Sequence, residues 1–126
     1  MAGNKADNKK YGNYGENLAC EYLEKHGFRI VKRNYRFHKL GEIDIIGYDI
    51  QDEEYLVFIE VKCRRNNSAG HASEAVGSAK QHKISKLALC YMSENGINPG
   101  NSNIRFDVVA IDAGTIEWIK NAFPYC

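Results

Sequence analysis

The chain has 126 residues, a net charge of +1 and 44% hydrophobic residues, which is the size and composition of one globular domain. The near-zero net charge excludes a bulk attraction to nucleic acid or to anionic membranes, so such contacts would have to come from local charge. The N-terminus is polar and no apolar run approaches the roughly 18 residues of a membrane span. The four cysteines form no CxxC pair. We therefore expect a cytoplasmic protein with reduced thiols and no membrane partner.

The first half of the chain predicts a helix followed by three strands. Residues 1–10 are polar and are expected to form a mobile tail, so that residues 11–126 make a single domain. Apolar residues recur at helical spacing between Tyr14 and His26. Strands are then predicted at residues 28–37, 41–49 and 55–64, joined by short turns, so these strands should form an antiparallel meander.

The second half predicts a long helix at about residues 72–94, a strand at 104–112 and a short strand or helical turn at 115–120. The strand at 104–112 follows a helix and can therefore lie parallel to a neighbouring strand. The order is α-β-β-β-α-β followed by a short end piece, which indicates an α/β fold with a mixed central sheet flanked by helices.

The stretch LVFIEVKCRR at residues 56–65 is the most strand-like in the chain, yet it carries Glu60 and Lys62. Side chains alternate between the two faces of a strand, so these two charges should share one face. In the preceding strand, alternation places Ile43 and Ile45 on one face and Glu42 and Asp44 on the other. Asp44 and Glu60 are therefore expected to meet.

A third acid, Glu16, borders the apolar stripe of the first predicted helix. Converging carboxylates repel one another and are costly to bury, so they need compensation. Two kinds of compensation remain open from the residues alone: an ion-pair network with Lys62, or a hard divalent cation bound by oxygen ligands. Buried ion pairs stabilise a fold poorly, which favours the cation. Glu42 could share the role of Asp44.

Fifteen residues separate Asp44 from the sequence Glu60-Val61-Lys62. This pattern resembles the D…ExK signature of the PD-(D/E)XK nuclease superfamily. Five stretches of the sequence are similar to the bacterial YraN-like family of predicted endonucleases. They are YGENLACEYLEKHGFRIVKRNYR, GEIDIIG, VFIEVKCR, EAVGSAKQHKI and RFDVVAI. The resemblance covers nearly the whole chain, from about residue 12 to residue 123.

This resemblance implies a restriction-endonuclease-like core of the Holliday-junction-resolvase-like branch and hydrolysis of phosphodiester bonds in DNA, branched DNA included, with Mg²⁺ or Mn²⁺. It implies Asp44, Glu60 and the backbone carbonyl of Val61 as metal ligands and Lys62 as the residue that positions the attacking water. Glu16 would bind a second metal ion or hold a metal-bound water. Ile43 stands where the superfamily pattern has proline.

Basic residues are segregated despite the balanced total charge. Residues 29–39 contain five Lys or Arg residues, one His and no acid, with two aromatic residues among them. Clustered cations contact phosphates, and exposed aromatic rings stack on unpaired bases. We expect nucleic-acid contacts from Lys80, Arg36, Arg64 and Gln81, although a solvated basic face is the plainer interpretation of the remaining basic residues.

Three functions follow from the sequence. The leading one is a metal-dependent endonuclease, the second a non-catalytic nucleic-acid-binding module that keeps the fold, and the third a different metal-dependent hydrolase. No Ser-His-Asp or Cys-His pattern and no glycine-rich phosphate loop is apparent, which disfavours nucleophilic and nucleotide-binding enzymes. A homodimer would suit two cuts on a symmetric junction.

Overall fold

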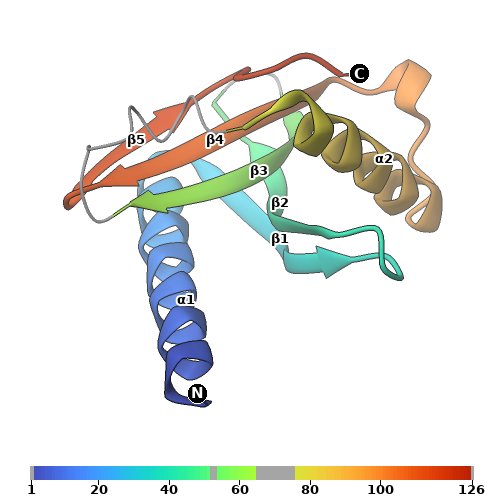
Figure 1. The fold of residues 1–126 in the computed structure, drawn as a ribbon. Coiled ribbons are helices and arrows are strands. Elements are labelled where there is room, and N and C mark those ends of the chain that lie inside the picture. The colour runs from blue at the N-terminus through green and yellow to red at the C-terminus, as the bar shows by residue number, and fades with distance from the viewer. Residues whose placement is uncertain (1, 52–53, 65–75, 126) are drawn as a thin grey trace.

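The computed structural model describes the backbone of residues 2–51, 54–64 and 76–125, and the side chains of all of these except residues 2–13 and 64. The elements are α1 (Ala2–Lys25), β1 (Phe28–Arg36), β2 (Glu42–Asp49), β3 (Tyr55–Arg64), α2 (Ser78–Glu94), a short 3₁₀ helix (Pro99–Asn101), β4 (Ile104–Asp112) and β5 (Thr115–Ile119). The chain therefore has the expected α/β architecture, with α1 and α2 against one mixed sheet (Figure 1).

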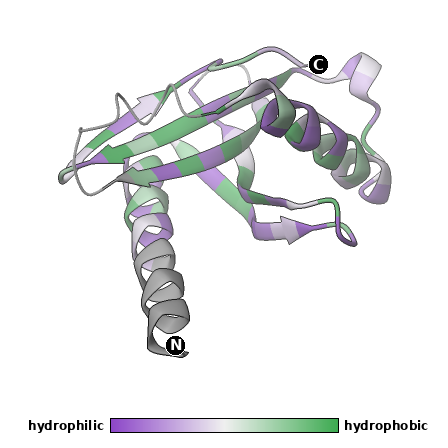
Figure 2. Ribbon diagram, in the orientation of Figure 1, coloured by the Kyte–Doolittle hydropathy of each residue, from purple (hydrophilic) through white to green (hydrophobic). Residues whose placement is uncertain are grey.

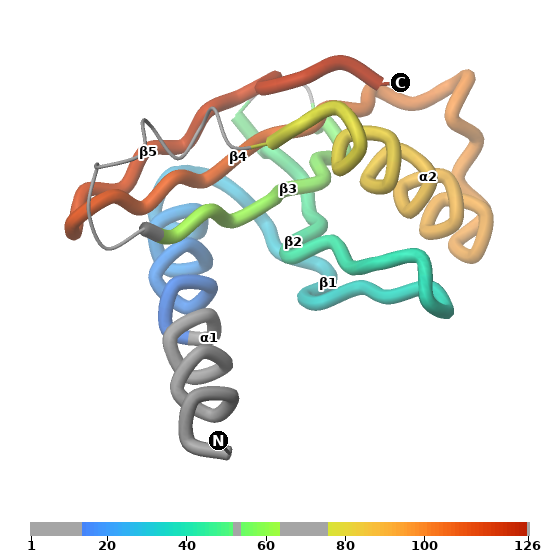
Figure 3. Tube along the Cα trace, viewed as in Figure 1, coloured from blue at the N-terminus to red at the C-terminus, as the bar shows by residue number. Residues whose placement is uncertain are grey.

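The five strands lie in the order β1-β2-β3-β4-β5. The pairs β1–β2 and β2–β3 are antiparallel, β3–β4 is parallel and β4–β5 is antiparallel. The meander and the parallel return strand are thus confirmed, and the segment predicted as a short strand or helical turn is the fifth strand. The tube view shows the β1–β2 hairpin extending below α2 (Figure 3).

Each face of the sheet carries its own hydrophobic core. On one face α1 contributes Ala19, Cys20 and Leu23, which pack with Val57 and Ile59 of β3. On the other face, residues of α2 cover a cluster that contains Phe58, Phe106 and Val108; the buried α2 residues are Ile84, Leu87, Ala88 and Met92. Because both faces are covered, hydrophobic residues run through the central strands β3 and β4 (Figure 2).

Both helices start elsewhere than predicted. Helix α1 begins at Ala2 and so passes through the segment expected to be a tail; the mobility of that segment stays a prediction. Helix α2 begins at Ser78, later than expected, because Gly77 is extended with φ −73° and ψ 167° and precedes the first turn. Val76 is therefore outside the helix although it packs in the core, and residues 72–75 lie outside the described residues.

The face assignment within β2 was wrong for one residue. Ile43 packs with Ile46 in the core under α2, whereas Ile45 packs in the core under α1. Simple alternation would put Ile43 with Ile45. The pattern breaks at Asp44, whose side chain accepts a hydrogen bond from the backbone of β3 instead of following the faces of the sheet.

A buried charged network lies elsewhere on the sheet, at the end where β2 finishes and β4 starts. The guanidinium of Arg105 donates to Asp49 Oδ2 and to Asp107 Oδ2, each at 2.8 Å. Trp118 Nε1 also donates to Asp107 Oδ2 at 2.8 Å, and Lys120 Nζ lies 2.9 Å from Asp49 Oδ2. Direct hydrogen bonds from Arg105 and Trp118 thus satisfy the carboxylates of this network.

Candidate metal centre

The acidic residues gather where the sheet divides. Strands β2 and β3 pair as far as Ile45 and Ile59. Beyond that point β2 continues beside β1, where Arg36 pairs with Glu42, while β3 continues beside β4 from Glu60 onward. We call this opening between β2 and β3 the fork.

Asp44 spans the fork. Its Oδ2 accepts a hydrogen bond of 2.8 Å from the backbone N–H of Val61. The Asp44 carboxylate therefore satisfies the Val61 N–H, which has no ladder partner where β2 separates from β3. This contact holds the Asp44 carboxyl beside Glu60, its partner if the β2–β3 register continued past Ile45 and Ile59.

Three carboxyl groups form a compact cluster at the fork. Glu16 from α1 and Glu42 and Asp44 from β2 each offer an oxygen, and these oxygens all lie within 4.8 Å of one another. We call these three residues the acidic cluster. Glu60 of β3 adjoins the cluster through a side-chain hydrogen bond with Asp44. The helix and both arms of the fork thus each supply an acid.

The cluster disfavours full ionisation. Burial raises the pKa of Asp44 to about 9, and the hydrogen bond with Glu60 and its negative charge act in the same direction. The Val61 N–H opposes this rise. Burial likewise raises the pKa of Glu16, against the opposing charge of Arg33. Perturbed carboxyl groups that face one another in a cleft are typical of functional sites.

Two carboxylate oxygens of the site are buried without a hydrogen-bond donor. They are Oε1 of Glu16 and Oε2 of Glu60. Buried acceptors are nearly always satisfied in proteins, and leaving one unsatisfied costs about 1–3 kcal/mol. A cation is therefore favourable beside both oxygens, and in the metal-free protein a basic side chain lies at ion-pair distance from each.

Cationic side chains surround the acids at ion-pair distance. Lys80 Nζ of α2 lies 3.0 Å from Glu60 Oε2, although not in a hydrogen-bonding direction. Arg33 Nη2 lies 3.5 Å from Glu16 Oε1, and Arg36 Nε lies 2.8 Å from Glu42 Oε2. Lys80 and Arg36 remain 45% and 74% exposed, so both can reach solvent and a ligand.

A cleft of about 450 Å³ opens between the fork and α2. Asp44, Glu60 and Lys80 line it, together with Glu42, Lys83 and an apolar wall of Leu40, Ile84 and Leu87. Lys62 follows Glu60 by two residues on β3 and is half-buried, but it does not line this cleft. The cleft therefore combines acids, cations and apolar walls on one side of the fork.

The structure brings some predicted contact residues to the site and not others. Lys80 lies at the acids and Arg36 borders the acidic cluster. The side-chain amide of Gln81 donates to the carbonyl oxygen of Val76 at 2.9 Å and does not line the cleft. The side chain of Arg64 lies outside the described residues. The roles of these residues in binding stay predictions.

Reasoning from the sequence gave Glu42 a minor role and did not identify Arg33 as a partner of Glu16. Glu42 is two residues before Asp44, and that spacing was the only signal for it. Arg33 comes to Glu16 from an irregular edge strand, because the register of β1 shifts between Ile30 and Lys32 and Asn34 has φ +54°. No periodic pattern in the sequence indicates this change in the direction of the β1 side chains.

Comparison with known proteins gives one consistent result. The profile of the "Uncharacterised protein family UPF0102" matches residues 15–111. A UPF0102 protein of Vibrio campbellii is 44% identical over 116 residues, which cover 90% of this chain and 92% of the relative. UPF0102 proteins of Vibrio vulnificus and Acetivibrio thermocellus are 42% and 38% identical, covering 88% and 96% of this chain and 89% and 96% of those relatives.

Proposed function

The chain belongs to the UPF0102 family, which is YraN-like, and from its own site we propose that it is a metal-dependent nuclease of the PD-(D/E)XK type that hydrolyses phosphodiester bonds in DNA. The observation that carries the proposal is the convergence of Glu16, Glu42, Asp44 and Glu60 at the fork, where two buried carboxylate oxygens accept no hydrogen bond. Basic side chains reach both oxygens at ion-pair distance, but without the direct hydrogen bonds that satisfy the aspartates of the Arg105 network.

The donor set suits Mg²⁺ or Mn²⁺. Both are hard cations that take carboxylate and carbonyl oxygens, and Mg²⁺ needs only one or two carboxylates from the protein. Asp44, Glu60 and the backbone carbonyl of Val61 would hold the ion, with Glu16 and Glu42 beside them. When bound, such an ion supplies Lewis-acid polarisation of the phosphodiester and activation of water.

The cations of the chain have separate roles in this proposal. Lys62 orients the attacking water or stabilises charge that develops on the phosphate. Lys80 is long and partly exposed, so its ammonium can leave Glu60 for a phosphate oxygen when a metal ion takes its place beside the carboxylate. Arg36 contacts a neighbouring phosphate from the β1 side of the cluster.

Cleavage assays test the proposal directly. The purified protein is incubated with duplex, single-stranded and four-way-junction DNA, with Mg²⁺, Mn²⁺ or EDTA. Asp44→Ala and Lys62→Met should each lower the rate by about 100-fold or more, the scale for removing a group that stabilises the transition state. Lys86→Met, which changes an exposed lysine of α2 outside the cleft, is the matched control. Equal rates in all three variants would show that the chemistry lies elsewhere.

One observation favours the alternative of a non-catalytic nucleic-acid-binding module that keeps the fold. Lys80 already stands 3.0 Å from Glu60, and a proton held by Asp44 removes a second negative charge. Together they could neutralise the fork without a metal ion. Calorimetric titration with Mn²⁺ separates the two functions, because the module should bind DNA in EDTA and take up no Mn²⁺ at the fork.

No helix in the described residues is long and apolar enough to cross a membrane. Action on branched DNA and assembly as a homodimer remain proposals; sedimentation of the protein alone and with a four-way junction tests both.

A further inference from the structure

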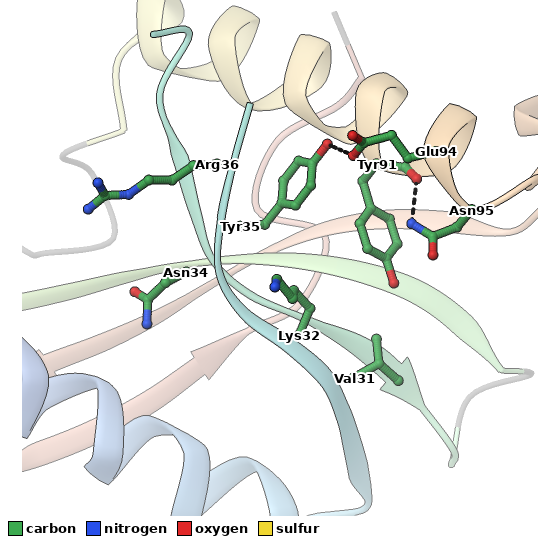
Figure 4. A pocket seen from close by; sticks show the side chains of 8 residues that line it. All are labelled: Val31, Lys32, Asn34, Tyr35, Arg36, Tyr91, Glu94 and Asn95. Carbon is green, nitrogen blue, oxygen red and sulfur yellow. Dashed lines mark hydrogen bonds between the residues drawn. The ribbon is translucent and has the colours of Figure 1, made fainter. Parts of the chain in front are cut away.

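A second hollow, of about 540 Å³, lies at the outer edge of β1, opposite the C-terminal turn of α2. Figure 4 shows Tyr35 reaching from β1 toward Tyr91 and Glu94 of α2, with Lys32 below it. Asn34 and Arg36 extend from the other side of the same strand (Figure 4). The hollow therefore wraps around the free edge of the sheet.

Two irregularities in β1 create this arrangement. The register shift between Ile30 and Lys32 inserts an extra residue into the strand, which re-aims the side chains that follow. Asn34 then adopts φ +54°, a conformation uncommon for residues other than glycine. As a result Tyr35 turns into the core under α2, while Arg33 turns to Glu16 on the α1 side. Strained positions of this kind concentrate at ligand sites.

The α2 side of the hollow offers aromatic and polar groups. The Tyr35 hydroxyl donates to the Glu94 carboxylate, so the one acid among the described residues that line the hollow already has a partner. The rings of Tyr35 and Tyr91 meet edge to face, with centroids 5.3 Å apart and an interplanar angle of 85°. The side-chain amide of Asn95 donates to the Tyr91 carbonyl at 2.8 Å, which directs its amide oxygen elsewhere (Figure 4).

The other side of the hollow touches the acidic cluster. Asn34 hydrogen-bonds to Glu16, and Arg36 is paired with Glu42 at 2.8 Å. Both residues line the hollow as well. A nucleic-acid strand whose phosphate lies at the cluster therefore reaches the hollow by crossing β1, with Arg36 between the two sites.

We infer that this hollow binds an unpaired nucleobase of a strand whose neighbouring phosphate lies at the acidic cluster. The inference rests on the proposed nuclease function and narrows its substrate to nucleic acid with a single-stranded segment beside a duplex. The half-buried ring of Tyr91 supplies a surface on which any base can stack, the amides offer hydrogen bonds to a base edge, and Lys32 and Arg36 contact the flanking phosphates. A duplex offers no base to such a hollow without unpairing, which costs energy.

The test measures binding without cleavage. Fluorescence anisotropy, in Ca²⁺ as a hard cation for the oxygen ligands and again in EDTA, compares a labelled blunt duplex with the same duplex carrying a single-stranded overhang. The wild-type protein should bind the overhang substrate more tightly, and Tyr91→Leu should reduce that preference by about fivefold or more, since stacking on one aromatic ring is worth about 1–3 kcal/mol per base. Lys32→Glu, at an exposed position, should reduce it without disturbing the core. Lys86→Glu, outside both hollows, should leave it unchanged.

Each outcome bears on a defined claim. If Lys32→Glu and Tyr91→Leu keep the full overhang preference while Asp44→Ala abolishes cleavage, the inference is wrong and the nuclease stands. If the preference disappears in both variants but the wild-type protein cuts no substrate with any metal ion, the hollow binds a base but the protein is a non-catalytic binding module. If the wild-type protein shows no preference for the overhang, the inference fails whatever the cleavage assay shows.

Discussion

Replacing Asp44 by asparagine should stabilise the metal-free protein, and increasingly so as the pH rises. The folded protein holds a proton on Asp44 up to about pH 9, whereas the unfolded chain releases it near the ordinary value of 3.8. The folded state therefore binds more protons across this window, so the free energy of unfolding falls as pH increases through it. Asparagine carries no such proton, and its side-chain oxygen can still accept the Val61 N–H.

The magnitude follows from the pKa shift. One unit corresponds to about 1.4 kcal/mol, so two pH units inside the window give at most about 3 kcal/mol. We expect Asp44→Asn to gain about 1–3 kcal/mol relative to wild type between pH 5 and pH 7. The lower part of that range allows for solvent that reaches the cleft beside Asp44.

Urea unfolding in EDTA at several pH values between 4 and 9 measures this gain. Glu117→Gln, which changes an exposed carboxylate of β5 in the same way, controls for the general effect of removing a negative charge. Parallel curves of unfolding free energy against pH for wild type and Asp44→Asn would refute the reasoning, because Asp44 would then titrate alike in the folded and unfolded chains.

Three further predictions follow from the same structure. Binding of Mn²⁺ at pH 7 should release about one proton from Asp44, seen as a dependence of the calorimetric heat on the ionisation enthalpy of the buffer; the same heat in every buffer would contradict this. Gly47→Ala should destabilise the fold by about 3 kcal/mol or more, because its Cβ would lie 2.2 Å from the Arg29 carbonyl oxygen, whereas Gly77→Ala meets no atom within 4 Å and should change the thermal midpoint little. Arg105→Met should cost about 3–5 kcal/mol in urea unfolding, since it leaves two buried aspartates without their guanidinium.

The amino-acid sequence determined the strands and most of the layering. Uninterrupted apolar runs bounded by turn residues placed the strands to within one or two residues, because strand pairing in a sheet covered on both faces tolerates few polar interruptions. Short turns and one long crossover then set the antiparallel meander and the parallel return strand. Glu60 and Asp44 could be brought together on these grounds alone.

Tertiary structure decided how the acids meet. The separation of β2 from β3 turns Asp44 off the face pattern and onto the Val61 N–H, and the irregular edge strand β1 sends Arg33 to one side and Tyr35 to the other. Such departures from side-chain alternation leave no periodic pattern in the sequence, since they depend on how two strands separate and on a single backbone dihedral at Asn34. The sequence by itself thus determined which residues are acidic and on which strands they lie, while the fork and the bulged edge decided that Glu42 joins them and that a second hollow lies beside them.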